Sequence, residues 1–370
     1  MIYMMVLITG FAFSTLIPRS NFFFYLYLFL LLMLASFRYG VGPDYFAYGD
    51  LYSLVDTSVF DQIGVVSGQE ILFRLFGSAL NSIGLSYQQY LALVALVTLY
   101  YIGKICKKYS QYPVFSLYLF FCTFYFVWVF SGIRQGLTIA IGIYYLLECL
   151  ENRKHIKFVS IVLILSLIHS ASMILLLFYV LAHLNLRRQT LLFGVFVGFC
   201  ISIIPSEYMM DFFNQLPYSE RIEFYFTTEA SESIRFYIDF KSIARLILLL
   251  GVVAFANVYD NGSEIQRKIM GLYIISFGIY FALKFVEILA AQSSIYGLVL
   301  MILILPNIYG QLEVKFNSKI FLTFVSIFSI AFYFKTLYSM EGMSYLNHSS
   351  LLTPYTNIFN KSGYSFPREL

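Results

Sequence analysis

The sequence predicts an all-α, polytopic integral membrane protein with about 12 transmembrane segments. Two observations lead to this fold class. The chain has 370 residues, of which 60% are hydrophobic and only 12% are charged, a composition typical of helical membrane proteins. Its apolar stretches also recur at lengths near the roughly 20 residues that a helix needs to cross a bilayer. We therefore expect most of the core to be embedded in lipid.

Four spans are expected before residue 131, at about 2–17, 21–37, 88–105 and 113–130. A long polar loop, residues 38–86, follows the second of them. Within this loop residues 70–80 have the apolar spacing of a short amphipathic helix on the membrane surface. Lys104, Lys107 and Lys108 end the third span, and such a cluster marks the cytoplasmic side. The 38–86 loop is therefore expected on the opposite, outer face.

A fifth span is expected at about 136–149, and the next apolar run, residues 158–184, is too long for one ordinary span and short for two. His169 and its neighbours interrupt this run at its centre, and basic residues flank both of its ends. The positive-inside rule then favours a hairpin that returns to the cytoplasm. Each arm reaches only about 20 Å into a core of roughly 30 Å. The tip with His169 would thus lie in a cavity open to the outer face, where irregular backbone can be buried or hydrated.

The remaining spans are expected at about 190–205, 242–258, 269–289, 293–309 and 320–335. A second long polar loop, residues 206–241, and a tail, residues 336–370, fall on the outer face in this topology. Lys284 and Glu287 would lie inside a span as a mutually neutralising pair, although an intramembrane ionisable residue is also a functional candidate. The whole chain is expected to form one transmembrane domain, residues 1–370.

Three polar islands are expected to face the same outer side: residues 37–48, 131–135 and 169–172. In the first, glycines and Pro43 exclude a regular helix and favour tight turns that hold Arg38 and Asp44 over the mouth of the membrane domain. The second contains Arg134 and Gln135.

Several arginines are expected on the outer face, beside acidic residues of the same loops. The arginines expected on this face are Arg38, Arg74, Arg134, Arg221 and Arg235, with Arg245 about one turn inside its helix. Arginine suits bidentate recognition of phosphate, so a lipid pyrophosphate is the natural ligand for several converging guanidinium groups. These groups would also stabilise the charge on a phosphate leaving group.

Other loop residues suggest how such a site could handle a sugar. The tyrosines that could stack on sugar rings are Tyr39, Tyr45, Tyr48 and Tyr52. Asp44 or His169 could take a proton from an attacking hydroxyl, and the residues do not decide between them. Purely structural interpretations remain open: interfacial arginines can extend to lipid headgroups, His169 could be a core histidine, and Glu70 with Arg74 could form a surface ion pair.

The sequence disfavours several function classes. The expected cytoplasmic loops leave no room for a nucleotide-binding domain, and no Walker A or Rossmann fingerprint is present, so neither ATP-driven transport nor use of cytoplasmic nucleotide sugars is expected. We expect no cofactor. The four cysteines have neither metal-ligand nor CxxC spacing, so we expect no metal site and no disulfide framework. A net charge of +4 gives no reason to expect a nucleic-acid partner.

These features resemble the EpsG family of Wzy-type polysaccharide polymerases. The landmarks are FRYGVGPDYFAY at 37–48, Glu70 with its amphipathic stretch, SGIRQGL at 131–137, SLIHSAS at 166–172, SIYGLVLMILILPNI at 294–308 and LTPYTNI at 352–358. One departure is that Gln292 stands ahead of Tyr296, where the family tends to place an arginine.

The resemblance implies a glycosyltransferase of the bacterial inner membrane that polymerises O-antigen, capsule or exopolysaccharide. A growing glycan would pass from undecaprenyl pyrophosphate to the non-reducing end of a lipid-linked repeat unit at the outer face, and a chain-length regulator and a flippase would be partners. Arg38 and Arg134 would bind the pyrophosphate, and Asp44 or His169 would activate the acceptor. The residues implied to shape the glycan groove or guide lipid phosphate are Tyr45, Tyr48, Glu70, Arg74, Gln135, Arg221, Arg235, Arg245, Gln292 and Tyr296. The rival functions are a flippase or transporter for lipid-linked oligosaccharide and an O-antigen ligase.

Overall fold

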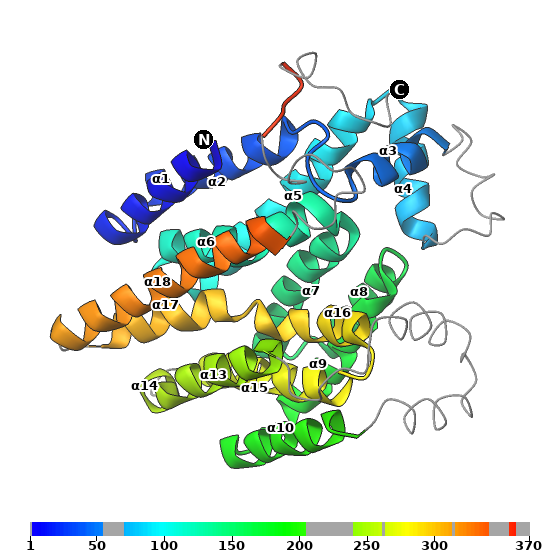
Figure 1. Cartoon of the computed structure of the whole chain (residues 1–370). Helices are drawn as coiled ribbons and strands as arrows, with labels where there is room; N and C mark the ends of the chain where they lie inside the picture. Colours follow the sequence, from blue (N-terminus) through cyan, green and yellow to red (C-terminus); the bar gives the residue numbers. More distant parts are fainter. Residues whose placement is uncertain are drawn as a thin grey trace, which may run out of the picture. The chain divides into compact units, whose positions relative to one another are not determined.

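The computed structural model describes residues 2–54, 70–204, 240–260, 263–312, 315–339 and 355–359. Across these ranges the chain is helical and contains no β-strand, apart from one isolated antiparallel bridge between Arg38 and Asn357. The helices group into two compact units, each described here by itself (Figure 1). Unit 1 comprises Met1–Cys149, Lys154–Met173 and Leu305–Leu370, and unit 2 comprises Leu150–Arg153 and Ile174–Ile304.

Unit 1 is built mainly from the first half of the chain. Its elements are α1 (Ile2–Leu16), α2 (Asn21–Ser36), α3 (Tyr45–Leu54), α4 (Ile71–Ser82), α5 (Tyr87–Tyr109), α6 (Pro113–Phe120), the π-helix η2 (Phe121–Ser131), most of α7 (Ile133–Asn152), α8 (His155–Ser166), the 3₁₀ turn η3 (Ser170–Met173) and α18 (Lys315–Ser339). α6 and η2 form the middle of this unit, because α1, α2 and α5 pack on α6 and α18 packs on η2.

Unit 2 is organised around α15. Its elements are α9 (Ile174–His183), α10 (Arg188–Ser202), α13 (Phe240–Ala254), α14 (Ala256–Asp260), α15 (Glu264–Ala282), α16 (Glu287–Leu298) and the start of α17 (Met301–Gln311). α9, α10, α13, α14 and α16 all pack against α15.

Within the described residues, five stretches of helix are long and apolar enough to cross a membrane, the pattern of a multi-pass membrane protein. They are Tyr87–Tyr109, Pro113–Ser131, Ile133–Asn152, Glu287–Gln311 and Ser318–Leu337. Shorter apolar helices occupy most of the other expected positions, including both arms of the expected hairpin, α8 and α9. The exception is the span expected at 269–289, where α15 overlaps only residues 269–282 and belongs to neither group. The all-α class is thus confirmed for the described residues, while the number of about 12 spans stays a prediction.

Two expectations about local structure are wrong. The stretch 37–48 is not irregular throughout, because α3 begins at Tyr45, directly after the turn made by Gly40, Gly42 and Pro43. Lys284 does not lie inside a span either. α15 ends at Ala282, so that Lys284 occupies the following turn and Glu287 opens α16, where a carboxylate favours the helix N-terminus.

The expected loop helix and tail can be compared with the structure only in part. The amphipathic helix expected at 70–80 is present as α4. The tail expected to begin at residue 336 overlaps the end of α18, which continues to Ser339. Most of the expected second outer loop, residues 205–239, lies outside the described residues.

Candidate active site

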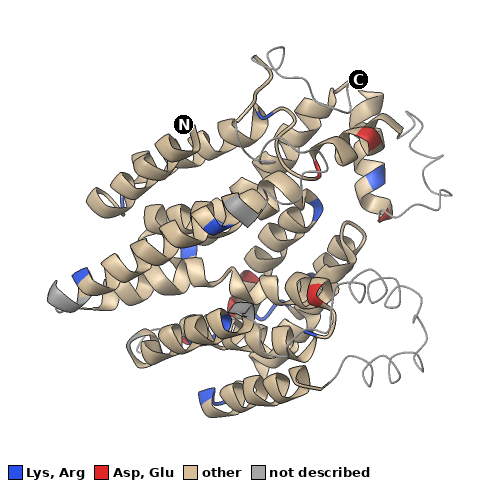
Figure 2. Cartoon of the chain, viewed as in Figure 1, with Lys and Arg blue, Asp and Glu red and all other residues tan. Residues whose placement is uncertain are grey.

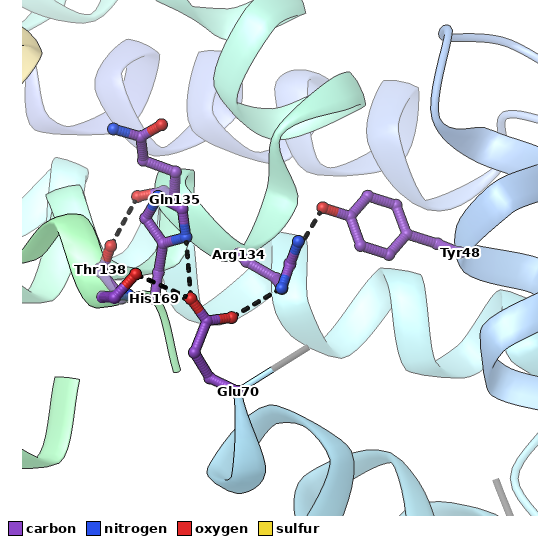
Figure 3. A network of polar contacts seen from close by, with 7 residues as sticks. Tyr48, Glu70, Arg134, Gln135, Thr138 and His169 are labelled. Carbon is purple, nitrogen blue, oxygen red and sulfur yellow. Dashed lines mark hydrogen bonds and ion pairs between the residues drawn. The ribbon is translucent and has the colours of Figure 1, made fainter. Parts of the chain in front are cut away.

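The three polar islands and Glu70 meet beside the first turn of α7, all within unit 1 (Figure 3). Ser131 Oγ donates a hydrogen bond of 2.7 Å to Asp44 Oδ2, which joins the first two islands. Arg134 Nη1 donates to Glu70 Oε2 at 2.7 Å, and Ser170 donates to Glu70 Oε1 through its amide and its hydroxyl, at 3.0 and 3.2 Å. Glu70 therefore links the arginine of the second island to the histidine-containing third.

Arg134 stands at the centre of this arrangement. Its Nε donates to Tyr48 Oη at 3.4 Å and its Nη1 to Glu70, while its guanidinium carbon lies 5.9 Å from the Tyr48 ring centre and 5.7 Å from that of Phe73. Nη2 has no hydrogen-bond partner among the described residues and is not fully buried, since the side chain is 22% exposed. The donors of Nη2 are therefore free to meet a ligand.

The position of Arg134 is electrostatically costly. It is the second residue of α7, where the unpaired amides carry the positive end of the helix dipole. A cation there opposes the dipole by about 0.3–1 kcal/mol, and Glu70 offsets part of this. The same combination, a guanidinium beside a helix N-terminus, favours binding of an anion.

Glu70 is held as a carboxylate. Burial alone would raise the pKa of Glu70, but hydrogen bonds from the Ser170 amide and its own amide, together with the charge of Arg134, lower it below its ordinary value. It occupies the N-cap position of α4 without a side-chain capping bond. The nearby hydrogen bond from the Leu72 amide to the Leu167 carbonyl, 2.9 Å, ties α4 to the chain before His169. Glu70 therefore stays ionised at neutral pH as it holds Arg134 and the Ser170 turn.

His169 lies beside Glu70, with 3.7 Å between its Nδ1 and Glu70 Oε1. Neither ring nitrogen has a hydrogen-bond partner in the described structure, and the side chain is only 13% exposed. Burial lowers the pKa of His169, Glu70 raises it and Arg134 lowers it, with a net result below the ordinary value. The imidazole is therefore neutral at pH 7, and one ring nitrogen carries an unused lone pair, but both ring nitrogens are buried in this conformation and must be uncovered to meet a substrate hydroxyl.

The sequence predicted that Arg38 lies over the mouth of the membrane domain. The structure instead buries it in unit 1. Its side chain is 2% exposed, its Nη1 donates to the Phe130 carbonyl, and its guanidinium carbon lies 4.6 Å from the Phe130 ring centre. The backbone around it pairs with the C-terminal segment 355–359: the Tyr39 amide donates to the Thr356 carbonyl at 2.9 Å. Arg38 thus braces the end of η2, one turn before Arg134, and is inaccessible to a phosphate in this conformation.

Several of the residues expected to contact substrate are buried in unit 1. Tyr45 packs in the core and donates to Gln88, and Tyr52 donates to the Leu85 carbonyl, so neither presents a ring face to a sugar. Arg74 and Gln135 are also buried. Tyr48 is half-buried beside Arg134 and remains the tyrosine closest to the expected role.

The remaining expected residues belong either to unit 2 or to the part of the chain outside the described residues. Arg245, Gln292 and Tyr296 belong to unit 2, where the Arg245 guanidinium carbon lies 3.6 Å from the Tyr280 ring centre and Tyr296 is fully buried. Arg221 and Arg235 lie outside the described residues. In the ranges that the structure describes, no group of three or more His, Cys, Asp or Glu side chains could hold a metal ion.

Two contributors were missed by sequence reasoning. Ser131 and Ser170 supply the hydrogen bonds that join the islands. Serine is too common in loops to be singled out, and its only signal was adjacency to Arg134 and His169. The C-terminal segment 355–359 was noted as a motif, but nothing local indicated that it pairs with residues 37–39.

Comparison with known proteins gives one family. The model described as the EpsG family matches residues 21–357, which is most of the chain. No curated protein and no solved structure matches the sequence. The chain belongs to the EpsG family, which is linked to exopolysaccharide synthesis.

Proposed function

We propose that this protein is a polysaccharide polymerase of the bacterial inner membrane. It transfers a growing glycan from undecaprenyl pyrophosphate to the non-reducing end of a lipid-linked repeat unit at the outer face. The observation that carries this proposal is the position of Arg134, which offers free donors at a helix N-terminus and shares Glu70 as a neighbour with the neutral His169. Family membership supports the same substrate class.

In the proposed reaction Arg134 binds the donor pyrophosphate. Nη2 and the first amides of α7 point positive charge at the phosphate oxygens, and Glu70 and Tyr48 hold the guanidinium in place. As the bond between the anomeric carbon and the pyrophosphate oxygen breaks, negative charge grows on the leaving group. Fixed donors stabilise that charge most when they are already oriented before the reaction.

His169 is the proposed general base. The acceptor hydroxyl attacks the anomeric carbon, its proton passes to the imidazole, and undecaprenyl pyrophosphate departs. Asp44 is the weaker candidate, because its carboxylate already accepts a hydrogen bond from Ser131. Ser131 and Asp44 instead join the first island to the start of α7, which sets the position of Arg134.

The surroundings of this reaction are part of the proposal. About 12 spans would place the three islands at the outer face, with His169 at the tip of the α8–α9 hairpin. A flippase would deliver the repeat units, and a chain-length regulator would set product size. Tyr48 would contact the glycan, while Arg221 and Arg235 would guide lipid phosphate.

Reconstitution tests the function directly. The full-length protein is placed in lipid vesicles with undecaprenyl-pyrophosphate-linked repeat units from its host, a chelator is added, and products are resolved on a gel. A ladder of lengthening glycans with release of undecaprenyl pyrophosphate is expected. Substrate crossing the bilayer without a ladder would indicate a flippase, and transfer only to a different acceptor would indicate a ligase.

A further inference from the structure

A pocket of about 500 Å³ lies in unit 2, where α9 ends and where α10 and α15 begin. Its cationic lining residues are Arg187, Arg188, Arg267 and Lys268. Among the described lining residues Glu264 is the single carboxylate, and it pairs with Lys268 at 2.7 Å. Much of the remaining lining is apolar, as with Leu191 and Met270. The pocket therefore combines an excess of positive charge with an apolar wall.

Helices α10 and α15, which both begin at this pocket, run in the same direction. The residues that meet are Leu191 with Gly271, Val195 with Gly278 and Gly198 with Ala282, so residue numbers rise together along the contact. The N-termini of α10 and α15 consequently lie at the same end. Neither N-cap residue, Arg187 or Ser263, makes a side-chain capping bond.

This end of unit 2 is therefore unusually positive. Two parallel helices bring the positive ends of their dipoles together, and the four basic side chains add to them. Figure 2 shows basic residues at the start of α10. Glu264 offsets one of these charges, which leaves a net positive charge, and helix N-termini with basic side chains are suited to bind phosphate.

We propose that this pocket binds the headgroup phosphate of an anionic phospholipid from the cytoplasmic leaflet. Basic residues that flank apolar helices mark the cytoplasmic side, and basic pockets between helices on that side hold anionic headgroups. A lipid fits better than free phosphate, because the pocket wall is apolar and Phe193 and Phe196 of α10 are 64% and 60% exposed. These side chains would contact the acyl chains.

Native mass spectrometry of the full-length protein tests this site. Delipidated protein is titrated with phosphatidylglycerol or with phosphatidylcholine of the same acyl chains. We expect one tightly held phosphatidylglycerol and much weaker binding of phosphatidylcholine. The double variant Arg187→Gln/Arg267→Gln, which alters two exposed side chains, should bind phosphatidylglycerol about 10- to 30-fold more weakly, as expected for two basic residues beside anionic lipid.

The matched control is Lys104→Gln/Lys108→Gln, which removes two exposed charges from α5 in unit 1. It should bind phosphatidylglycerol as the wild type does, and both variants should melt as the wild type does. Equal binding of the two lipids, or unchanged binding by the arginine variant, would overturn the proposal. Displacement of phosphatidylglycerol by millimolar inorganic phosphate would also overturn it, since the site would then be one for soluble phosphate.

Discussion

The guanidinium of Arg134 has three nitrogen positions, and two of them are used to hold it in place. Lysine has a single ammonium group, which cannot pair with Glu70 and also present donors to a substrate phosphate in the same geometry. Arg134→Lys should therefore lower the polymerisation rate about 100-fold, the loss typical of one oriented donor to a leaving oxyanion.

The control for this variant is Tyr48→Phe. It removes only the long 3.4 Å bond to Nε and keeps the ring beside the guanidinium, so its polymerisation rate should fall no more than a few-fold. Near-normal rate in Arg134→Lys would mean that simple positive charge suffices.

His169 sets the expected pH dependence of the reaction. Its pKa is below the ordinary value of about 6.5, so the base is neutral above that pH and becomes protonated only in more acidic solution. The wild-type rate should be flat above about pH 6.5 and fall only in more acidic solution, where the imidazole with its lowered pKa becomes protonated. His169→Gln should lose about 10²–10⁴ in rate, and its residual activity should lack this acid limb. An unchanged acid limb in the variant would assign the base to another group, with Asp44 the first to examine.

Residue types at these positions could be predicted in part. The convergence of Arg134, His169 and the 37–48 stretch was visible in the sequence, because positive-inside reasoning places all three polar islands on one face. The burial of Arg38 could not be predicted, since its partners are the carbonyl of Phe130, 92 positions away, and the distant C-terminal segment. Tyr45 and Tyr52 likewise lie in a polar stretch of sequence. Only the formation of α3 directs their side chains into the core.

At the scale of elements, η2 and α7 form the rigid base under the site. A Cβ on Gly136 of α7 would lie 1.8 Å from the Trp128 carbonyl oxygen of η2, so the two helices approach as closely as glycine allows. Because the obstructing atom belongs to the backbone, it cannot rotate away. Gly132 separates the two helices, and a Cβ there would lie 3.1 Å from the ring of Trp128.

Gly136→Ala should lower the free energy of unfolding by about 1–3 kcal/mol or more, measured by thermal melting in detergent. Gly251→Ala in α13 is the matched control, since a Cβ there meets nothing within 4 Å. Its melting temperature should be unchanged or slightly higher. Equal melting of the two variants would show that η2 and α7 do not pack as described.

Helix positions followed closely from apolar length, as α5, α7 and α18 show. The exceptions are α3 and the break at 283–286. α3 was missed because the glycines and the proline before it indicate turns. The helix begins only after these residues, at Tyr45. The break at 283–286 was missed because Lys284 and Glu287 interrupt a run that remains apolar on average.

At the scale of the whole molecule, the orientation of the hairpin decides whether His169 can meet an outer-face substrate. Cysteine labelling tests it. Cys200 is exposed and should first be replaced by serine, whereas Cys106, Cys122 and Cys149 are buried. A cysteine at Ser170 should then react with a thiol reagent added from outside, because the proposed topology opens the tip outward. A cysteine at Arg187, which that topology puts on the cytoplasmic side, should not react, and its labelling from outside would refute the topology.

The most direct test of the central claim is glycan length made by Arg134→Ala in reconstituted vesicles, beside wild type and Arg245→Ala as a control in unit 2. The proposal predicts that Arg134→Ala is folded and inserted but forms no ladder, a loss of at least about 10²–10³ in rate. Arg245→Ala should still form a ladder, because Arg245 belongs to unit 2 and makes none of the hydrogen bonds that hold Arg134. A normal ladder from Arg134→Ala would contradict the assignment of this cluster as the transfer site.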